Sequence, residues 1–468
     1  MKKRHEMWEL QQMQALRLKM KIKLTQSRIR QWVNEFGEDG VYISFSGGKD
    51  STVLLDIARK MYPEIKAVYV DTGLEYPEIK HFVKGFDNVE IIRPEMVFKD
   101  VIIKYGYPMI SKEVSECVQG ARKYLTSILD ENTIARQTDS IVIPTFMTSS
   151  RGKGNTQKEI IPSVDEESFK KMSRGDTTTS IEDYEELANI LNERMLTRQG
   201  GANQRLAIML GWLTKDKEHP IQANIPSKDR SQFSLERYKY FLEAPFEISN
   251  KCCNVMKKKP AHTYSRKSGK KPITAQMAAE SRLRTQKWLQ SGCNAFDAKN
   301  PISNPMSFWT EQDVLLYIKQ NNLELCSVYG DIVEDLTGTE EVEGQLTISD
   351  LEGFEDMGLF DAKRLPLKTT GCTRTGCMLC GFGCHLEKSP NRFERMAETH
   401  SKLLDYVMRG GAFDKDDGLW KPDKRGLGFW FILKWINVHG NFNIAIPNYE
   451  QYEKEYGTEL TREYLKKE

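Results

Sequence analysis

SGGKDS at residues 46–51 joins an apolar run, VYISF (41–45), to a run of helical composition, TVLLDIA (52–58). Glycines let the backbone turn tightly and approach a ligand closely, and the first free N–H groups of a helix attract an anion. Lys49 adds a positive charge, and Ser46 and Ser51 add hydroxyl groups. The spacing differs from the Walker pattern, which disfavours a kinase-like or GTPase-like site. The residues therefore predict a phosphate-binding turn between a strand and a helix.

A second strand-like run, AVYVDTG (67–73), ends in an acidic residue and a glycine. Parallel strands of a doubly wound sheet bind ligands at their carboxyl ends, so both runs predict one nucleotide site. Asp71 is the expected contact for a ribose or for Mg²⁺. The residues expected to contact ATP are Ser44, Ser46, Gly47, Gly48, Lys49, Asp50, Ser51, Asp71, Thr72 and Gly73.

The composition is that of a globular protein with 468 residues, 39% hydrophobic and 29% charged. This length is enough for two or three domains. No apolar run approaches the roughly 18 residues of a membrane helix, and no apolar leader follows the N-terminus. We therefore expect a cytoplasmic protein that does not contact a membrane. The net charge of +2 gives no general argument for nucleic-acid binding.

Changes in composition along the chain suggest four regions. We predict amphipathic helices over 1–38, an α/β domain over 39–330 with an insertion at about 125–200, an acidic insertion over 331–370, and a cysteine motif with a C-terminal region over 371–468. Residues 146–182 are polar and poorly periodic, which is typical of a mobile insertion. Thr310 is a natural N-cap, with Asp313 three residues later. The aromatic stretch from Gly426 to Tyr449 predicts a packing element.

The nine cysteines are not spaced as a disulfide framework, and a reducing compartment would not maintain one. Cys117, Cys293 and Cys326 stand alone and are expected to be buried. Cys377 and Cys380 form a Cys-x-x-Cys pair between glycines, and Cys252 and Cys253 are adjacent. Adjacent cysteines fit tetrahedral zinc poorly and suit a cuboidal cluster better, although zinc stays an alternative. Cys372 and Cys384 are left to carry sulfur, to resolve a disulfide or to replace a ligand.

These motifs together resemble the adenosine phosphosulfate reductase family of PP-loop ATP pyrophosphatases. The resemblance runs from Val41 to Cys384 and is carried in order by SGGKDS, TGLEYPE (72–78), YGYP (105–108) with Ser111 and Lys112, KCC (251–253) with KKKP (257–260), ESRLR (280–284), NP (304–305) with WTEQDV (309–314), and Gly376-Cys377 with Cys380. It implies a PP-loop α/β fold with a doubly wound parallel sheet, and cleavage of ATP between the α and β phosphates with Mg²⁺. It also implies a [4Fe-4S] cluster on Cys252, Cys253, Cys377 and Cys380, with Cys384 as a substitute ligand.

Two features separate this sequence from the reductases of that family. Residues 385–468 contain no cysteine, whereas those reductases attack the sulfonate with a cysteine on a C-terminal tail. The loop also keeps Gly47, Gly48 and Lys49, which would hold the β and γ phosphates of ATP. In these respects the chain is similar to ATP-dependent sulfur-inserting proteins, namely transfer-RNA thiolases and phosphorothioate-forming DNA sulfur transferases.

The resemblance implies a sulfur transferase in which Lys49 and Asp50 assist adenylation of an acceptor. Cys372 is the candidate sulfur carrier because its basic neighbours Lys368 and Arg374 would favour the thiolate. The expected phosphate and acceptor contacts are Lys112, Lys257, Lys258, Lys259, Arg282 and Arg284. The acceptor is left open among tRNA, DNA and a small molecule; a cysteine desulfurase is the expected sulfur donor, and a homodimer is considered. A nucleotide- and redox-sensing regulatory protein and a thiol-dependent phosphosulfate reductase are the alternatives.

Overall fold

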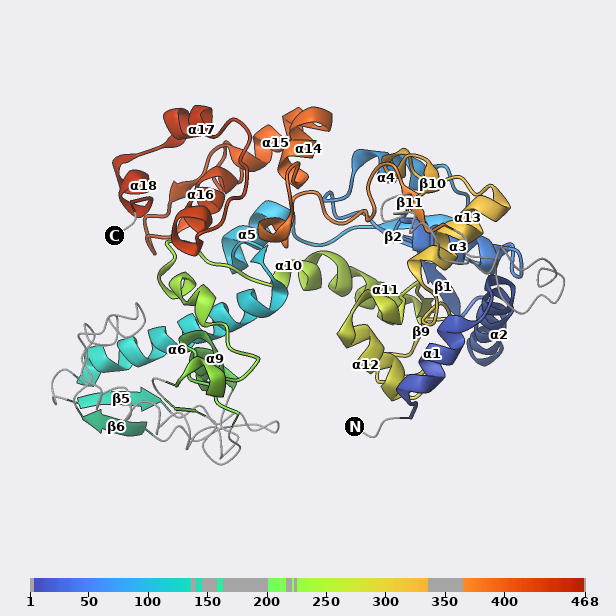
Figure 1. The fold of residues 1–468 in the computed structure, drawn as a ribbon, viewed down its shortest axis with the longest axis horizontal. Coiled ribbons are helices and arrows are strands. Elements are labelled where there is room, and N and C mark those ends of the chain that lie inside the picture. Colours follow the sequence, from blue (N-terminus) through green and yellow to red (C-terminus); the bar gives the residue numbers. More distant parts are fainter. Residues whose placement is uncertain are drawn as a thin grey trace, which may run out of the picture. The chain divides into compact units, whose positions relative to one another are not determined.

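The computed structural model describes residues 4–135, 140–144, 158–162, 201–215, 221–222, 225–335 and 365–466. The chain forms two compact units. Figure 1 labels the helices and strands of both units. Unit 1 comprises Met1–Val97 and Val255–Met378, and unit 2 comprises Phe98–Asn254 and Leu379–Glu468. Most residues of the predicted insertions, including 163–200 and 336–364, lie outside the described residues. So does most of the stretch 146–182 that is predicted to be mobile, apart from residues 158–162.

Unit 1 is built on a six-stranded sheet in the order β3-β2-β1-β7-β9-β8. All neighbouring strands are parallel except β8 and β9, which are antiparallel. The strands are β1 (Val41–Ser44), β2 (Ala67–Val70), β3 (Val89–Ile92), β7 (Lys271–Ile273), β8 (Asn294–Ala295) and β9 (Ile302–Ser303). The chain runs outward from β1 to β3 and returns to the other side of β1 with β7. The reversal places the loop after β1 at the point where doubly wound sheets bind ligands, as the sequence predicts.

Helices surround this sheet, and two further short strands, β10 (Ile332–Glu334) and β11 (Leu367–Thr369), pair antiparallel. The helices of unit 1 are α1 (Met7–Ala15), α2 (Leu18–Phe36), α3 (Lys49–Arg59), α4 (Pro77–Lys84), α11 (Lys259–Ser268), α12 (Arg282–Ser291) and α13 (Glu311–Asn321). A π-helical turn, Asn254–Lys258, precedes α11. Thr310 caps α13 and forms a capping box with Asp313, which confirms the start predicted for this helix.

The N-terminal region forms two helices, and α2 belongs to the core of unit 1. Its side chains Ile29, Trp32 and Val33 are buried with those of β1 and α3, in agreement with the apolar spacing of the sequence. The ammonium group of Lys21 is also buried, 2.6 Å from the carboxylate of Asp313. Because a buried charge needs such a partner, this ion pair ties α2 to the start of α13.

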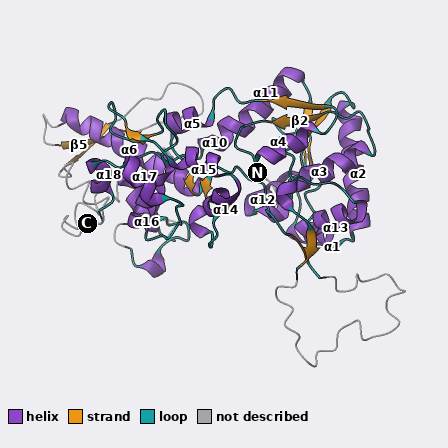
Figure 2. Cartoon of the chain, turned by 90° about the horizontal axis from the view of Figure 1, so that it is seen from above, coloured by secondary structure: helices purple, strands orange, loops and turns teal. Residues whose placement is uncertain are grey.

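Unit 2 is mainly helical, with short strand pairs, as the colouring of Figure 2 shows. Its helices are α5 (Phe98–Tyr105), α6 (Lys112–Ala135), α9 (Gly201–Leu210), α10 (Lys251–Cys253), α14 (Arg392–Thr399), α15 (Ser401–Met408), α16 (Phe429–Gly440), α17 (Tyr449–Tyr456) and α18 (Glu459–Tyr464). Its strands are β4 (Met109–Ile110), β5 (Ser140–Pro144), β6 (Lys158–Pro162), β12 (Gly381–Phe382), β13 (Ala412–Phe413) and β14 (Trp420–Lys421).

Helix α16 is the centre of the C-terminal part of unit 2. Seven of its twelve side chains are buried, including Trp430, Phe431 and Trp435, so the helix is apolar on nearly every face. Trp435 packs against Phe241 and Phe246 from earlier in the chain. This burial confirms the packing element predicted from the aromatic stretch. Among the described residues, no helix is long and apolar enough to cross a membrane.

Candidate active site

The loop between β1 and α3 has the shape that the sequence predicts. Gly47 has a φ of +69°, and a Cβ atom there would lie 2.8 Å from the side chain of Val83 and 2.9 Å from that of Ile79. Both the backbone conformation and the space therefore require glycine. Gly48 is the N-cap of α3, so the free N–H groups at the start of this helix face the loop.

Two serine hydroxyls fix the loop from inside. The Oγ atoms of Ser46 and Ser51 lie 3.0 Å apart, and the Ser51 hydroxyl donates to the Gly48 carbonyl at 2.9 Å. The Ser46 N–H donates to Ser51 Oγ at 3.2 Å. Ser44 ends β1 next to Val68 of β2 and is half-buried. These serines shape the turn, and Ser46 is exposed and accessible to a ligand.

Lys49 is buried, with 3% of its surface exposed. Its ammonium group lies 2.9 Å from Glu311 Oε1 and donates to the Thr373 carbonyl at 2.6 Å. The ring of Tyr329 lies beneath it, 5.6 Å from Nζ to the ring centre. In this arrangement the charge of Lys49 is paired with a carboxylate.

The segment 371–376 lies against the phosphate loop. Besides the Thr373 carbonyl, the Thr375 hydroxyl lies 2.7 Å from that of Tyr329, and Tyr329 Oη accepts the backbone N–H of Lys49 at 3.1 Å. A Cβ atom on Gly48 would lie 3.3 Å from Thr375 Oγ1. This segment also carries Cys372, so the fold brings a candidate sulfur carrier and the phosphate loop to one region of unit 1.

Asp50 carries an unsatisfied atom beside the loop. Its Oδ1 is buried and has no hydrogen-bond partner within the described part of the chain. Burial raises the pKa of Asp50, and the charge of Lys49 opposes that shift. A buried carboxylate oxygen without a partner is costly unless a cation or donor completes it. Its oxygen chemistry fits Mg²⁺, which binds carboxylates together with phosphate oxygens.

The polar side chains of the loop after β2 already have partners within the protein. Asp71 Oδ2 lies 2.7 Å from Lys80 Nζ and 3.3 Å from Arg93 Nε. Burial alone would raise the pKa of Asp71, but these two cations outweigh it and hold the pKa below its usual value. The Thr72 hydroxyl binds the carboxylate of Glu75 at 2.7 Å. A Mg²⁺ ion or a ribose at Asp71 would therefore have to compete with two ion pairs.

Glu75 links this loop to a thiol of the Cys-x-x-Cys pair. Lys257 Nζ lies 3.3 Å from Glu75 Oε1, and the side chain of Lys257 also hydrogen-bonds Cys377. Burial alone would lower the pKa of Lys257, but Cys377 and Glu75 raise it well above its usual value. The permanent charge of Lys257 favours the thiolate form of Cys377. Lys257 is thus placed at a thiol, where the sequence predicted an acceptor or phosphate contact.

The other predicted cationic contacts are dispersed. Arg284 ion-pairs with Glu280 and lies close enough to Asp50 for their charges to interact. Arg282 at the start of α12 is exposed, as is Lys258 in the turn before α11. Lys112 begins α6 in unit 2 and is exposed. Of these residues, the fold brings only Arg284 into electrostatic contact with the phosphate loop.

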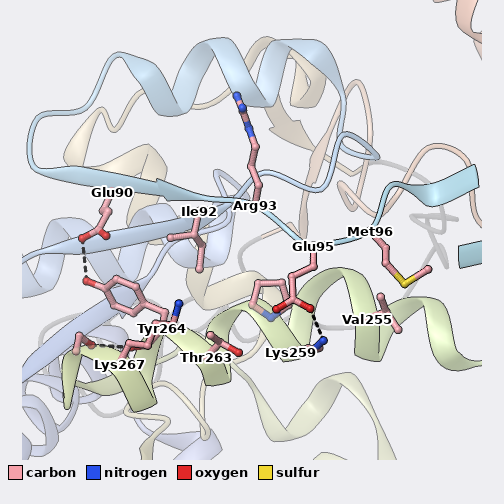
Figure 3. A pocket seen from close by; sticks show the side chains of 12 residues that line it. Glu90, Ile92, Arg93, Glu95, Met96, Val255, Lys259, Thr263, Tyr264 and Lys267 are labelled. Atoms are coloured by element: carbon pink, nitrogen blue, oxygen red, sulfur yellow. Dashed lines mark hydrogen bonds and ion pairs between the residues drawn. The ribbon is translucent and has the colours of Figure 1, made fainter. Parts of the chain in front are cut away.

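Lys259 lines a separate cavity of about 460 Å³ between β3 and α11, shown in Figure 3. It ion-pairs with Glu95 there, and the Tyr264 hydroxyl donates to Glu90 at 3.0 Å. The cavity is lined by Glu90, Ile92, Arg93, Glu95, Met96, Val255, Lys259, Pro260, Thr263, Tyr264, Lys267 and Ser268. None of these belongs to the phosphate loop, and three of the charged side chains, Glu90, Glu95 and Lys259, are already bound to partners within the cavity.

Cys372 is half-buried, and its thiol lies 3.5 Å from the hydroxyl of Tyr76. Lys368, which the sequence predicted to favour the thiolate, binds Asp335 at 2.7 Å. Asp335 therefore compensates the positive charge of Lys368. Arg374 is exposed and interacts electrostatically with Asp50. Cys326 is buried, as predicted.

The remaining predicted ligands belong to unit 2. Cys252 and Cys253 lie in α10, which packs against α5, while Cys380 precedes β12. Cys384 is buried, and its burial raises its pKa to about 12. The guanidinium of Arg392 donates to the Cys380 carbonyl and interacts with both Cys380 and Cys384. His385 lies between Tyr238 and Phe442, and burial lowers its pKa, as suits a neutral packed side chain.

None of the nine cysteines, all of which lie within the described residues, forms a disulfide. Within the described ranges, however, no group of three or more His, Cys, Asp or Glu side chains is arranged to hold a metal ion. The thiol donors are compatible in chemistry with an iron–sulfur cluster or with zinc. The ligand set Cys252, Cys253, Cys377 and Cys380 remains a prediction.

Sequence reasoning missed three contributors to the phosphate site: Glu311, Tyr329 and Thr375. They follow Lys49 by more than 250 residues, and no local pattern links them to the loop. Glu311 occupies the first turn of a helix, where an acidic residue is favoured for the helix alone. Its second role at Lys49 is visible only in the fold.

A family model matches the regions that form this site, and two known proteins are similar to parts of the chain. The model of the phosphoadenosine phosphosulfate reductase domain matches residues 40–116 and 216–381, which include the phosphate loop and the Cys-x-x-Cys pair. An adenosine 5'-phosphosulfate reductase of Oceanobacillus iheyensis is 24% identical over 135 residues, 25% of this chain and 56% of that protein. An uncharacterized protein of Methanocaldococcus jannaschii is 35% identical over 69 residues, 14% of this chain and 17% of that protein. The chain thus spans little more than half the length of one relative and a sixth of the other. The family match covers more than half of the chain, which therefore belongs to the phosphoadenosine phosphosulfate reductase family and has its PP-loop α/β fold.

Proposed function

We propose that this chain is an ATP-dependent sulfur transferase that adenylates an acceptor, releases pyrophosphate and then replaces AMP by sulfur. The observation that carries the proposal is the complete phosphate loop with a thiol-bearing segment against it. Thr373, next to Cys372, accepts a hydrogen bond from Lys49 at 2.6 Å. A loop that binds three phosphates suits an enzyme that cleaves ATP, and an adjacent thiol suits sulfur chemistry.

The first step is adenylation, which this chain assists by positioning and electrostatic stabilisation. An acceptor oxygen forms a bond to the α-phosphorus, and the bond to the β-phosphate oxygen breaks. The N–H groups at the start of α3 and the Ser46 hydroxyl bind the departing pyrophosphate. Lys49 exchanges Glu311 for a phosphate oxygen. Mg²⁺ held by Asp50 would offset the remaining negative charge.

The second step is sulfur transfer, with Cys372 as the carrier. The terminal sulfur of a Cys372 persulfide attacks the adenylated carbon, so a carbon–sulfur bond forms and AMP leaves with the former acceptor oxygen. An external thiol then cleaves the sulfur–sulfur bond, releases the product sulfur and is itself oxidised to a disulfide with Cys372. A cysteine desulfurase is the proposed source of the persulfide sulfur, and a nucleic acid or small molecule is the acceptor.

Cys252, Cys253, Cys377 and Cys380, with Cys384 as a substitute, would hold a [4Fe-4S] cluster, which when bound supplies an iron that can coordinate sulfur. Within this chain, Lys257 would keep Cys377 in the thiolate form that a ligand requires. Burial makes the free Cys384 thiol hard to ionise, which favours Cys380 over Cys384 as a ligand.

The proposal is tested on protein purified without oxygen. We expect about four iron atoms per chain, loss of iron in Cys377→Ser, and retention of iron in Cys117→Ala, whose thiol is buried outside the predicted set. Cys372→Ser should keep the iron and the acceptor-dependent release of pyrophosphate but form no thiolated product. One zinc per chain without iron would contradict the cluster, and full sulfur transfer by Cys372→Ser would contradict the carrier role.

The similarity to an adenosine 5'-phosphosulfate reductase favours a second candidate, a thiol-dependent phosphosulfate reductase. The two functions differ in their nucleotide requirement. A reductase releases sulfite from adenosine 5'-phosphosulfate with an added thiol and needs no ATP, whereas the proposed transferase consumes ATP and forms AMP and pyrophosphate. Sulfite release without ATP would favour the reductase.

A further inference from the structure

Arg374 lies at the centre of the segment that contacts the phosphate loop. Its neighbour on one side, Thr373, accepts the hydrogen bond from Lys49. Its neighbour on the other side, Thr375, binds Tyr329, which in turn accepts the N–H of Lys49. Because residues on both sides of Arg374 are held at the loop, its backbone is fixed there as well.

The guanidinium group of Arg374 is exposed and forms no ion pair or hydrogen bond with any part of the chain that the structure describes. Its charge acts on Asp50 and on Arg284. Burial raises the pKa of Asp50, and the charge of Arg374 opposes this larger effect. Burial lowers the pKa of Arg284, and the charge of Arg374 lowers it further. Arg374 and Arg284 are thus close enough to repel each other. By contrast, Lys368, six residues earlier, binds Asp335.

Two guanidinium groups near each other are unfavourable unless an anion lies between them or beside both. The nearest anion-binding feature is the start of α3, where Gly47 and Gly48 expose backbone N–H groups. The buried Oδ1 of Asp50 has no hydrogen-bond partner in the described residues, so this oxygen contacts neither guanidinium group. Glu280 pairs with Arg284 but not with Arg374. No carboxylate in the described part of the chain pairs with both guanidinium groups. An anion with several oxygens, such as a polyphosphate, could bind both of them.

We infer that Arg374, together with Arg284, binds the phosphate chain of the nucleotide held by the loop. The inference rests on the proposed ATP-binding role of the loop and deepens it, because it gives the segment next to Cys372 a direct contact with the substrate. A planar guanidinium binds phosphate oxygens through two parallel hydrogen bonds, which an ammonium group does not reproduce. Phosphate bound by Arg374 would also fix the position of Cys372, two residues away.

The test is equilibrium binding of MgATP to the full chain, measured by titration calorimetry with three variants. Arg374→Ala should weaken binding about tenfold or more, since a charge-assisted hydrogen bond is lost. Arg374→Lys should restore only part of the affinity. Lys368→Ala removes the same charge from the same part of the chain and should bind MgATP as the unchanged protein does. Thermal unfolding should differ little among the variants, because Arg374 is exposed.

The outcomes separate this inference from the proposed function. Equal MgATP affinity of Arg374→Ala and the unchanged protein would overturn the inference and leave the proposed function standing. An equal loss in Lys368→Ala would also overturn it, because general attraction would then explain the effect. If the unchanged protein binds adenosine 5'-phosphosulfate but not ATP, and Arg374→Ala loses that binding, the contact holds while the proposed function fails. Binding of neither nucleotide would overturn both.

Discussion

The loops after β1 and β2 lie at the carboxyl ends of neighbouring parallel strands, yet their charged side chains differ in whether the protein provides partners for them. After β2, Asp71 is bound by Lys80 and Arg93. After β1, Asp50 Oδ1 is buried without a partner in the described chain, and Arg374 near it makes no ion pair there. The β2 loop is complete without a ligand, whereas the β1 loop holds charges that a ligand would complete.

The presence or absence of such partners distinguishes charged side chains that stabilise the fold from those that are suited to bind a ligand. A buried carboxylate with two cationic partners contributes to stability, and its removal leaves those partners unsatisfied. A buried carboxylate oxygen without a partner costs stability, which is typical of sites that bind a ligand. Under the proposed function, metal and phosphate would bind at the β1 loop, and Asp71 would have a mainly structural role. The variants below test this assignment.

Lys49→Ala has the largest expected effect. The variant should lose a hundredfold or more of the rate of AMP and pyrophosphate formation, because the charge that stabilises the leaving pyrophosphate is removed. Lys60→Ala, at the other end of α3, removes an exposed charge that pairs with Asp56 and should keep the rate. Quantifying AMP by chromatography checks both. A rate within threefold of the unchanged protein in Lys49→Ala would contradict the account.

Asp50→Asn should reduce Mg²⁺ activation more than stability, whereas Asp71→Asn should reduce stability more than Mg²⁺ activation. Asp50→Asn should weaken Mg²⁺ activation of ATP cleavage about tenfold or more, with little loss of stability, because the carboxylate is already unsatisfied. Asp71→Asn should keep most Mg²⁺ activation. Mg²⁺ titrations of the initial rate measure the difference. If only Asp71→Asn changes the Mg²⁺ dependence, the two loops have been assigned the wrong way round.

Asp71→Asn should lower the free energy of unfolding by about 1–2 kcal/mol at pH 7. The pKa of Asp71 is below its usual value in the folded protein, so its stabilisation is present above the unfolded pKa of about 4 and is lost as the pH falls through the folded value. Urea unfolding should show the two proteins converging at acidic pH. Asp297→Asn, which breaks an exposed pair with Arg4, is the control and should change little at any pH.

Glu311→Gln has the smallest expected effect, and its direction is the opposite of the others. The carboxylate of Glu311 holds Lys49 and would repel phosphate, so removing its charge should tighten MgATP binding about threefold to tenfold. Glutamine keeps a hydrogen-bond acceptor for Lys49. Glu324→Gln, at an exposed position, should bind as the unchanged protein does. Weaker binding in Glu311→Gln would show that Glu311 supports the nucleotide site.

The sequence predicts those parts of the molecule that depend on neighbouring residues. The strand, glycine turn and helix around Gly47, the cap of α13 at Thr310 and the buried α16 all agree with local patterns. Contacts between distant segments were not predictable in this way. Lys49 meets Thr373 across 324 residues, and Asp335 neutralises Lys368. Each of these contacts changes the role expected of a charged residue, since the partner decides whether a charge is available to a ligand.

The measurement that tests the central claim most directly is the fate of ATP labelled separately at the α and γ phosphates. The unchanged protein, incubated with Mg²⁺ and an accepted sulfur acceptor, should convert the α label to AMP and the γ label to pyrophosphate in equal amounts. The β1 loop would then bind ATP and direct its cleavage between the α and β phosphates. Release of the γ label as free phosphate with formation of ADP would contradict the account.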